Sequence, residues 1–284
     1  MDLITHLLNS LYTMAAMVEA RDAYTGGHLW RVSQFSRLLA EDMALPDEEV
    51  AQITLGGFLH DLGKIGVPDA ILNKPDRLTD EEYAIIKTHP ALGEQLLSGH
   101  PLGHLVRDAV VMHHETPDGR GYPAGLTAPH IPLVAKIVGI TDAFDAMTST
   151  RPYRKGMPIE RALEIIGENL ERQFDLDVGE RFIALGKAGH LAHIVGHSDA
   201  GIPLQSCPNC GPIIALPRKT RTGDMAACPS CHGEFRTLGG EGDWRLVPTG
   251  RKAPAQPLFI DHDLIALLAS SARAGLGNHV LQTA

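Results

Sequence analysis

Histidine and aspartate residues recur through the first half of the chain, as single residues and as adjacent pairs, each on or beside a different predicted helix. Apolar residues repeat at intervals of three and four over most of the first 190 residues, so this region is expected to be helical. The residues of the series are His28, His60, Asp61, His89, His113, His114 and Asp142. A helical bundle can direct side chains from several helices into one interior cavity. The series therefore predicts a bundle that gathers these seven side chains.

The chemistry of these residue types indicates a metal centre. Neutral imidazoles and carboxylates are good ligands for divalent Fe, Mn, Ni or Zn. A buried aspartate is costly unless it is paired or bound to a metal. Asp61, directly after a candidate ligand, could bridge two ions. Isolated histidines elsewhere, such as His190 and His262, are expected to be ordinary surface or core residues.

Local signals place most of these residues on helices. Helices are predicted over about 3–18, 28–43 and 131–148, from the acidic start at 45–49 through His60, from the capping-box sequence at Thr79, over about 102–115, and from Pro158. His89 precedes Pro90, where a helix tends to break or kink. The segment 116–123 is rich in Gly and Pro and is expected to be a loop.

Long motifs in the first 190 residues resemble a known family. Residues 113–123 read HHETPDGRGYP and match the pattern HHExxDGxGYP at every fixed position, and LHDLGKIG (59–66), KTHP (87–90), DAFDAMT (142–148) and RPYR (151–154) accompany it in order. Over roughly residues 10–190 the chain resembles the HD-GYP family of the HD superfamily of metal-dependent phosphohydrolases. The resemblance implies an all-helical domain that hydrolyses cyclic di-GMP to linear pGpG, to GMP, or to both.

The resemblance also implies roles for individual residues. One ion would be held by His28, His60, Asp61 and Asp142, and the other by Asp61, His89, His113 and His114. Lys64 would contact the scissile phosphate, so that Asp61 and Lys64 form the catalytic pair, and Tyr122, Arg151 and Arg154 would line the substrate pocket. Ordinary alternatives for these residues are a surface lysine, turn packing of the tyrosine and salt bridges of the arginines.

The number of ions follows from one departure from the family pattern. Some members place a Glu four residues before the first His ligand to help hold a third metal, and this chain has Tyr24 there. Two divalent ions are therefore expected, Fe or Mn first and Ni or Zn as alternatives. Glu19 is not in the register of that ligand and is expected to be a structural carboxylate.

Four cysteines form a second, separate pattern. Cys207, Cys210, Cys228 and Cys231 have the spacing CxxC-x17-CxxC, which is close to that of a structural zinc site. Four thiolates fill a tetrahedral shell and leave no open position, so the zinc would serve folding. The segment resembles a zinc ribbon, a small β module.

These patterns give a mainly α chain with a small β module near its end. The expected parts are an HD-type helical domain over 1–190, a linker over 191–204, a zinc-ribbon-like domain over 205–252, and a tail over 253–284 with a short helix near 258–268.

Charge and hydropathy limit the partners. The formal net charge of −9 disfavours general nucleic-acid binding, which needs Lys and Arg at phosphates. Residues 207–254 carry seven Lys and Arg against four Asp and Glu, so the ribbon is a candidate surface for a protein partner, and the apolar first helix is a candidate surface for a second copy. No apolar run reaches the ~18–20 residues that cross a bilayer and no leader peptide is visible, so the chain is expected to be cytoplasmic.

The function expected from these observations is a metal-dependent phosphodiesterase acting on cyclic di-GMP. Two alternatives stay open: a cyclic-dinucleotide receptor without turnover, and a phosphohydrolase for another cyclic nucleotide. A complete set of seven ligands and a lysine favours the enzyme, because a receptor does not need them.

Overall fold

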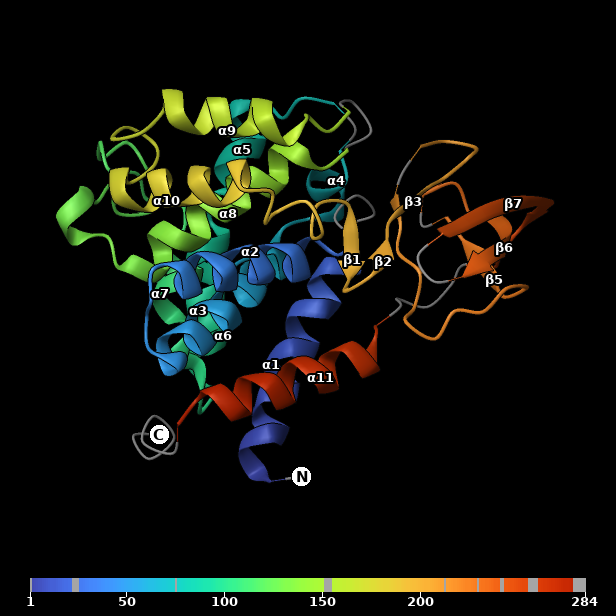
Figure 1. Ribbon diagram of the computed structural model, residues 1–284, viewed down its shortest axis with the longest axis horizontal. Coiled ribbons are helices and arrows are strands. Elements are labelled where there is room, and N and C mark those ends of the chain that lie inside the picture. The colour runs from blue at the N-terminus through green and yellow to red at the C-terminus, as the bar shows by residue number, and fades with distance from the viewer. Residues whose placement is uncertain are drawn as a thin grey trace.

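The fold is a bundle of helices beside a small group of strands (Figure 1). A computed structural model describes residues 2–21, 26–74, 76–150, 155–211, 213–228, 230–240, 243–254 and 260–277. The α-helices described are α1 (Leu3–Glu19), α2 (His28–Asp42), α3 (Asp47–Leu59), α4 (Asp69–Leu72), α5 (Asp80–Ile86), α6 (His89–Leu97), α7 (Arg107–Met112), α8 (Leu133–Thr148), α9 (Ile159–Glu168), α10 (Leu176–Lys187) and α11 (His262–Gly275). Short 3-10 helices lie at η1 (Leu62–Gly66), η2 (Gly103–Leu105) and η3 (Ala128–His130). The prediction of a mainly α chain with a small β module is confirmed.

Side-chain caps fix where several helices begin. Asp2 accepts a hydrogen bond of 2.8 Å from the backbone N–H of Thr5 at the start of α1. Thr79 and Glu82 form the predicted capping box of α5, each side chain bonding the other residue's backbone N–H. Such caps satisfy N–H groups that the first helical turn leaves unpaired, and each contributes about 1 kcal/mol.

Aromatic packing holds the two helices that carry the first and last residues of the His/Asp series. Phe35 of α2 and Phe144 of α8 meet edge to face, with ring centroids 5.2 Å apart. Phe182 of α10 packs on Phe144 in the same way at 5.0 Å. All three rings are fully buried. This arrangement fixes α2 against α8 over the core, since edge-to-face pairs favour one relative orientation.

The predicted break near Pro90 is present: it separates α5 from α6, which starts at His89. Two other predicted helix boundaries differ in the structure. The helix expected over 102–115 is instead η2 followed by the shorter α7, because this turn is packed closely on α6: a Cβ on Gly103 would lie 2.2 Å from the Leu97 carbonyl oxygen. The helix expected from 131 starts at Leu133, because Pro132 occupies the N-cap.

The strands form small antiparallel sheets after α10. β1 (His197–Asp199) pairs with β2 (Ile202–Pro203), and β3 (Gln205–Ser206) pairs with β4 (Ile213–Ile214). The third sheet has the order β5 (Met225–Ala227), β6 (Gly233–Gly240), β7 (Asp243–Lys252). The hydrophobic cluster of this module consists, among the residues described, of the buried side chains of Cys207, Ile214, Leu216, Cys228 and Phe235. A core of this size is too small to be stable by burial alone, so a further crosslink such as a metal is expected.

The last helix returns to the helical part. α11 lies beside α1 in Figure 1 and buries Ile265, Leu268, Ala269 and Ala272 in the core that α1 and α3 share. Arg273 contacts Asp2 at 2.9 Å across this junction. The helix expected near 258–268 therefore begins later and ends at Gly275.

Candidate metal centre

All seven residues of the His/Asp series lie around one point of the bundle. Their ligand atoms form three overlapping groups, with the atoms of each group within 4.8 Å of one another. One group, His28, His60 and Asp142, is called the carboxylate side below. A second, His89, His113 and His114, is called the imidazole side.

Asp61 lies between the two sides. Its Oδ2 is 3.6 Å from His28 Nε2 and 3.4 Å from His60 Nε2. Its Oδ1 is 3.6 Å from His89 Nε2, on the other side. The two oxygens of one carboxylate therefore face different ligand sets, which is the geometry that a bridging ligand needs.

A close approach of two segments puts Asp61 and His89 in register. Asp61 precedes η1, and His89 begins α6. A Cβ added to Gly63 would lie 1.8 Å from the His89 carbonyl oxygen, so a larger residue would push these segments apart. Gly63, the first glycine of the LHDLGKIG motif, is thus required by the short distance between η1 and α6.

Four histidines turn the same nitrogen outward. His28 Nδ1 is 2.7 Å from Asp145 Oδ2, and His60 Nδ1 is 2.8 Å from the Gly57 carbonyl oxygen. The Nδ1 atoms of His89 and His113 bond the carbonyl oxygens of Ile86 and Ala109 at 2.8 and 2.9 Å. An acceptor at Nδ1 holds the proton there, so the Nε2 lone pair of each ring is directed to the centre, as in metal-binding histidines.

Two observations show that a cation fits this donor set. His60 Nε2 is buried and has no hydrogen-bond partner among the residues described, although buried polar atoms are normally paired. His89 Nε2 and His113 Nε2 lie 3.3 Å apart. With the protons held on Nδ1, two lone pairs face each other at that distance, and a metal ion coordinated by both nitrogens would relieve the repulsion.

The electrostatics of the two sides are opposite. Burial would lower the pKa of His28, but hydrogen bonds to Asp145 and Asp61 outweigh it and raise that pKa to about 10. Burial lowers the pKa of His89 to about 4 and that of His114 to about 3. Burial and neighbouring imidazoles hold the pKa of His113 well below its usual range. The carboxylate side therefore attracts protons and metal ions alike, whereas the imidazoles of the other side are uncharged at neutral pH.

Lys64 and Tyr122 lie at this centre, as the sequence predicts. Lys64 Nζ is 2.6 Å from Asp61 Oδ2, and its side chain is 25% exposed. Burial would raise the pKa of Asp61, but the charges of Lys64 and His60 hold it well below its usual range. The Tyr122 ring stacks on His114, with centroids 4.6 Å apart and planes at 26°. Tyr24, Arg151 and Arg154 lie outside the described residues.

The loop that carries Tyr122 is held by a residue that the motif fixes but whose role the sequence left unassigned. Glu115 is buried, and its two carboxylate oxygens accept hydrogen bonds from the backbone N–H groups of Ala124 and Leu126, at 2.7 and 2.8 Å. Asp118 accepts hydrogen bonds from the hydroxyl of Thr116 and the N–H of Arg120. The acidic residues of HHExxDGxGYP therefore shape the loop, and the histidines and tyrosine face the centre.

Sequence reasoning also missed Arg31 and Asp145, which lie directly behind His28. Each stands three residues after a candidate ligand on the same helix, Arg31 after His28 and Asp145 after Asp142. Both are 1% exposed, and Arg31 Nε is 2.6 Å from Asp145 Oδ1. The signal available in the sequence was a charged residue one helical turn after a candidate ligand, because such positions lie on the same helix face. Glu19, in contrast, accepts a hydrogen bond of 2.9 Å from the Leu29 N–H near the start of α2.

Known proteins resemble this chain over the region that contains the His/Asp series. A family model described as HD domain matches residues 12–178, which is more than half of the chain and includes all seven candidate ligands.

The chain belongs to the HD-domain family.

The resemblance inferred from the motifs is thereby confirmed, and membership implies binding of divalent metal. The HD domain here is 41% identical over 168 residues to the cyclic di-GMP phosphodiesterase response regulator RpfG of Xanthomonas campestris, covering 58% of this chain and 44% of that protein. It is 41% identical over 176 residues to 3'3'-cGAMP-specific phosphodiesterase 3 of Vibrio cholerae, covering 62% and 37%.

A third relative is a cyclic di-GMP phosphodiesterase of Thermotoga maritima, 39% identical over 183 residues, with 64% of this chain and 50% of that protein covered. The chain thus spans half or less of the length of these curated relatives. None of the helices in the described residues is long and apolar enough to cross a membrane.

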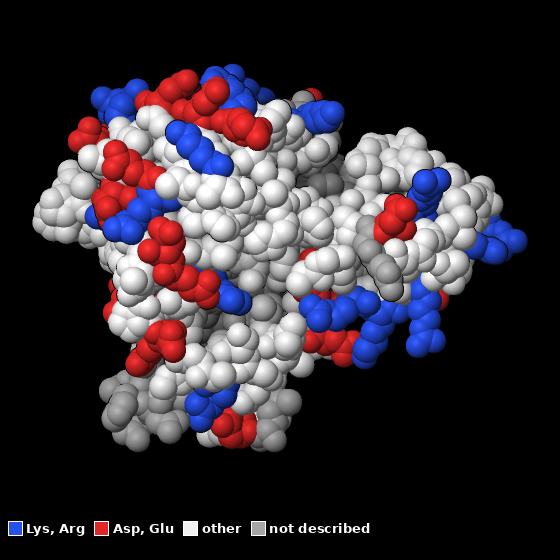
Figure 2. All heavy atoms as spheres, in the orientation of Figure 1, with Lys and Arg blue, Asp and Glu red and all other residues white. Residues whose placement is uncertain are grey.

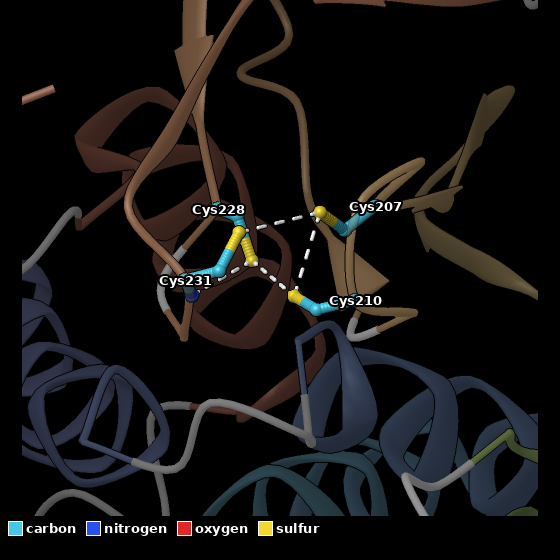
Figure 3. Close-up of side chains that lie close together, drawn as sticks. All are labelled: Cys207, Cys210, Cys228 and Cys231. Carbon is cyan, nitrogen blue, oxygen red and sulfur yellow. Dashed lines mark hydrogen bonds between the residues drawn. The ribbon is translucent and has the colours of Figure 1, made fainter. Parts of the chain in front are cut away.

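The four cysteines beyond the HD domain converge on a second point (Figure 3). The Sγ atom of Cys207 is 3.7 Å from that of Cys231 and 3.6 Å from that of Cys210, and Cys210 is 3.6 Å from Cys228. These separations are too long for a disulfide, which has sulfurs about 2.05 Å apart. They match the edge of a tetrahedron with metal–sulfur distances of about 2.3 Å, which is about 3.8 Å. The cluster therefore has the geometry of a closed tetrathiolate site.

Proposed function

We propose that this HD domain is a metal-dependent phosphodiesterase that hydrolyses cyclic di-GMP to linear pGpG, to GMP, or to both. The observation that carries the proposal is the convergence of seven ligands on one point, with Asp61 between two ligand sets. A module that only binds nucleotide has no need for such a centre.

The ligands divide between two divalent ions, for which Fe or Mn are the first candidates and Ni or Zn the alternatives. His28, His60 and Asp142 would hold one, His89, His113 and His114 the other, and Asp61 would bridge them. When bound, such a pair supplies a water of lowered pKa and positive charge at the attacked phosphate. The Nδ1 hydrogen bonds of His28, His60, His89 and His113 favour the tautomer that leaves Nε2 available to a metal at the centre.

Four side chains of the chain itself would bind the substrate. Lys64 lies beside Asp61 and offers an ammonium group to a non-bridging phosphate oxygen. Tyr122 presents an aromatic ring next to His114, on which a nucleobase can stack. Arg151 and Arg154 stay predicted contacts to phosphate or guanine edges, because their forked guanidinium groups suit both.

The substrate assignment draws on the names of the relatives. RpfG and the Thermotoga maritima protein are named for cyclic di-GMP, and the Vibrio cholerae protein for 3'3'-cGAMP. All three names describe cyclic dinucleotides, so the substrate class is better supported than the choice of base. A cyclic-dinucleotide receptor without turnover and a hydrolase for another cyclic nucleotide are the alternatives.

A direct assay separates these readings. The purified chain is loaded anaerobically with Fe(II) or Mn(II) and given cyclic di-GMP and 3'3'-cGAMP in parallel, and the products are resolved by chromatography. Linear dinucleotide or mononucleotide from cyclic di-GMP is the expected result. Faster turnover of 3'3'-cGAMP would make that nucleotide the substrate in place of cyclic di-GMP. Tight binding of both nucleotides without any product would support the receptor function.

The zinc assignment at the cysteines has its own measurement. One zinc per chain is expected by elemental analysis after purification, and it should stay bound when a carboxylate-type chelator removes the ions of the His/Asp centre, because thiolates prefer Zn over Mn. A chain with four free thiols and no zinc would contradict this.

A further inference from the structure

Arg31 is a buried cation whose every donor is used. It is 1% exposed and belongs to the largest fully buried side chains. Its Nε and Nη2 bond the two oxygens of Asp145 at 2.6 and 3.0 Å, and Nη2 also bonds Ser149 Oγ at 3.1 Å. Its Nη1 bonds the carbonyl oxygens of Gly26 at 3.0 Å and His197 at 2.9 Å. A guanidinium has five N–H donors, so the geometry of this group is fully determined by its partners.

Two of these partners lead in opposite directions. Asp145 Oδ2 also accepts a hydrogen bond from His28 Nδ1 at 2.7 Å, so Arg31 and Asp145 together set the orientation of that imidazole. His197 belongs to β1, the first strand after the helical part. Two side chains therefore connect the backbone of β1 with a ligand of the carboxylate side.

The start of α2 is built to accept β1 at this point. Gly27 has a φ of +73°, and a Cβ on it would lie 2.5 Å from the Cα of Ser198. Any side chain at this position would displace the strand, in addition to the strain of left-handed backbone. The close contact keeps the His197 carbonyl oxygen within reach of Arg31.

β1 in turn contacts the segment that carries the four cysteines (205–252), which is called the cysteine module below. Asp199 is 3% exposed, and its Oδ2 lies 2.5 Å from both Nε and Nη2 of Arg218. Arg218 stands between the two cysteine pairs in sequence, after Cys210 and before Cys228. Lys219, next to it, contacts Asp263 of α11 at 2.7 Å. Figure 2 shows basic and acidic side chains meeting where the module adjoins the helices.

Next to these contacts the module and the helices border a cavity of about 1130 Å³, which Gly27, Ser198 and Asp199 help to line. The direct contact at β1 therefore lies at the edge of a gap, and a shift of the module would act on the helices through such edge contacts.

From these contacts we infer that β1 is part of the metal centre: Arg31 and Asp145 are positioning residues that transmit the place of β1, and with it the folded state of the cysteine module, to His28. The inference rests on the proposed role of His28 as a metal ligand. The cysteine module would then have a function that does not require a separate partner.

The test measures metal affinity without substrate. Mn(II) is titrated into the full chain and followed by electron paramagnetic resonance and calorimetry, which resolve a tighter and a weaker ion. Arg31→Lys keeps the charge but cannot bond Asp145 and the His197 carbonyl together. It is expected to weaken Mn(II) binding on the carboxylate side about tenfold or more, the usual effect of losing a partner behind a metal ligand. The ion at His89, His113 and His114 should be retained.

Arg218→Met tests the outer part of the connection without touching the helical core. It removes the Asp199 contact and is expected to weaken the same ion in the same direction, by less than Arg31→Lys does. Lys219→Met is the matched control, because it removes a neighbouring contact of the module to α11 that does not involve β1. It should leave both Mn(II) affinities unchanged. Thermal unfolding of each variant separates a loss of affinity from a loss of fold.

The outcomes divide cleanly. Unchanged Mn(II) affinities in Arg218→Met, or equal losses in Arg218→Met and Lys219→Met, would overturn the connection through β1. Two ions in the unmodified chain without hydrolysis of cyclic di-GMP would overturn the proposed activity and leave this test valid. Failure of the unmodified chain to bind Mn(II) at all would overturn both.

Discussion

His28 and His113 face the same centre from opposite sides, and their surroundings have opposite effects. His28 lies among Asp61, Asp142 and Asp145, which raise its pKa to about 10 against the effect of burial. His113 lies among His60, His89 and His114, and burial together with these imidazoles depresses its pKa. Identical side chains thus give a side that competes for cations and a side that offers bare lone pairs. The two ions of one centre therefore need not bind alike.

The largest effect is expected where the two sides share a ligand. Asp61→Ala removes the carboxylate that faces both, so both ions should be lost. Turnover should fall by about a thousandfold or more, since the ions supply both the attacking water and the charge on the phosphate. Elemental analysis and the chromatographic assay measure the two effects.

Asp177→Ala is the control for this variant, because Asp177 is an exposed carboxylate on α10 whose described contact is with Arg181. It should keep both ions and full activity. An Asp61→Ala protein that retains both ions would show that the two sides do not share this ligand.

Single-side variants separate the two ions. His28→Ala should lose the ion of the carboxylate side and keep the other, and His113→Ala should do the reverse. Each should lower turnover by about a hundredfold or more, because one ion supplies several kcal/mol of charge stabilisation. The number of ions bound at the His/Asp centre should fall from two to one in both, with the zinc of the cysteines unchanged.

His190→Ala, at an exposed position outside the centre, is the matched control. Loss of both ions in His28→Ala together with retention of both in His113→Ala would contradict the expected assignment of one ion to each side.

The pH dependence of binding sharpens the contrast. In the metal-free protein His28, with a pKa raised to about 10, is an imidazolium at neutral pH, and an ion must displace its second proton. His89 and His114, with pKa values lowered to about 4 and 3, are neutral imidazoles without that second proton. Affinity on the carboxylate side should therefore rise by about tenfold per pH unit between about pH 6 and pH 8, as one displaced proton requires. The imidazole side should change little over this range.

Mn(II) titrations at three pH values give both slopes. Calorimetry in two buffers of different ionisation enthalpy then counts the protons released by each ion. Equal slopes for the two ions would mean that their surroundings are equivalent once metal is present.

The smallest effect concerns the ring that stacks on the imidazole side. Tyr122→Leu removes the aromatic face beside His114 and should raise KM for cyclic di-GMP by about tenfold, which corresponds to a base-stacking contribution within about 1–3 kcal/mol. Tyr122→Phe keeps the ring and should stay within about twofold of the unmodified chain, since stacking does not need the hydroxyl. If Tyr122→Leu lowers kcat by a larger factor than it raises KM, the ring would be assigned to the structure of the loop instead.

Local patterns in the sequence were sufficient to select the candidate ligands. The histidines and aspartates stand in motifs whose spacing puts each on or beside a particular helix, and the cysteines repeat at knuckle spacing. Helix starts such as Thr79 were predictable for the same reason, because a cap depends on residues three positions apart. The positions of Gly63 and Glu115 were visible in the motifs, but their roles depended on distances between segments.

By itself, the sequence determined the mainly α class, the seven candidate His/Asp ligands and the four cysteines, because each rests on contacts within a few residues or on donor chemistry. Only the tertiary structure decided which nitrogen of each imidazole faces the centre, that α11 packs on α1, and that β1 reaches His28 through Arg31 and Asp145. Arg31 and Asp145 are 114 positions apart, and Arg31 and His197 are 166 apart. No local periodicity encodes such pairs, since they form only when the whole core has packed.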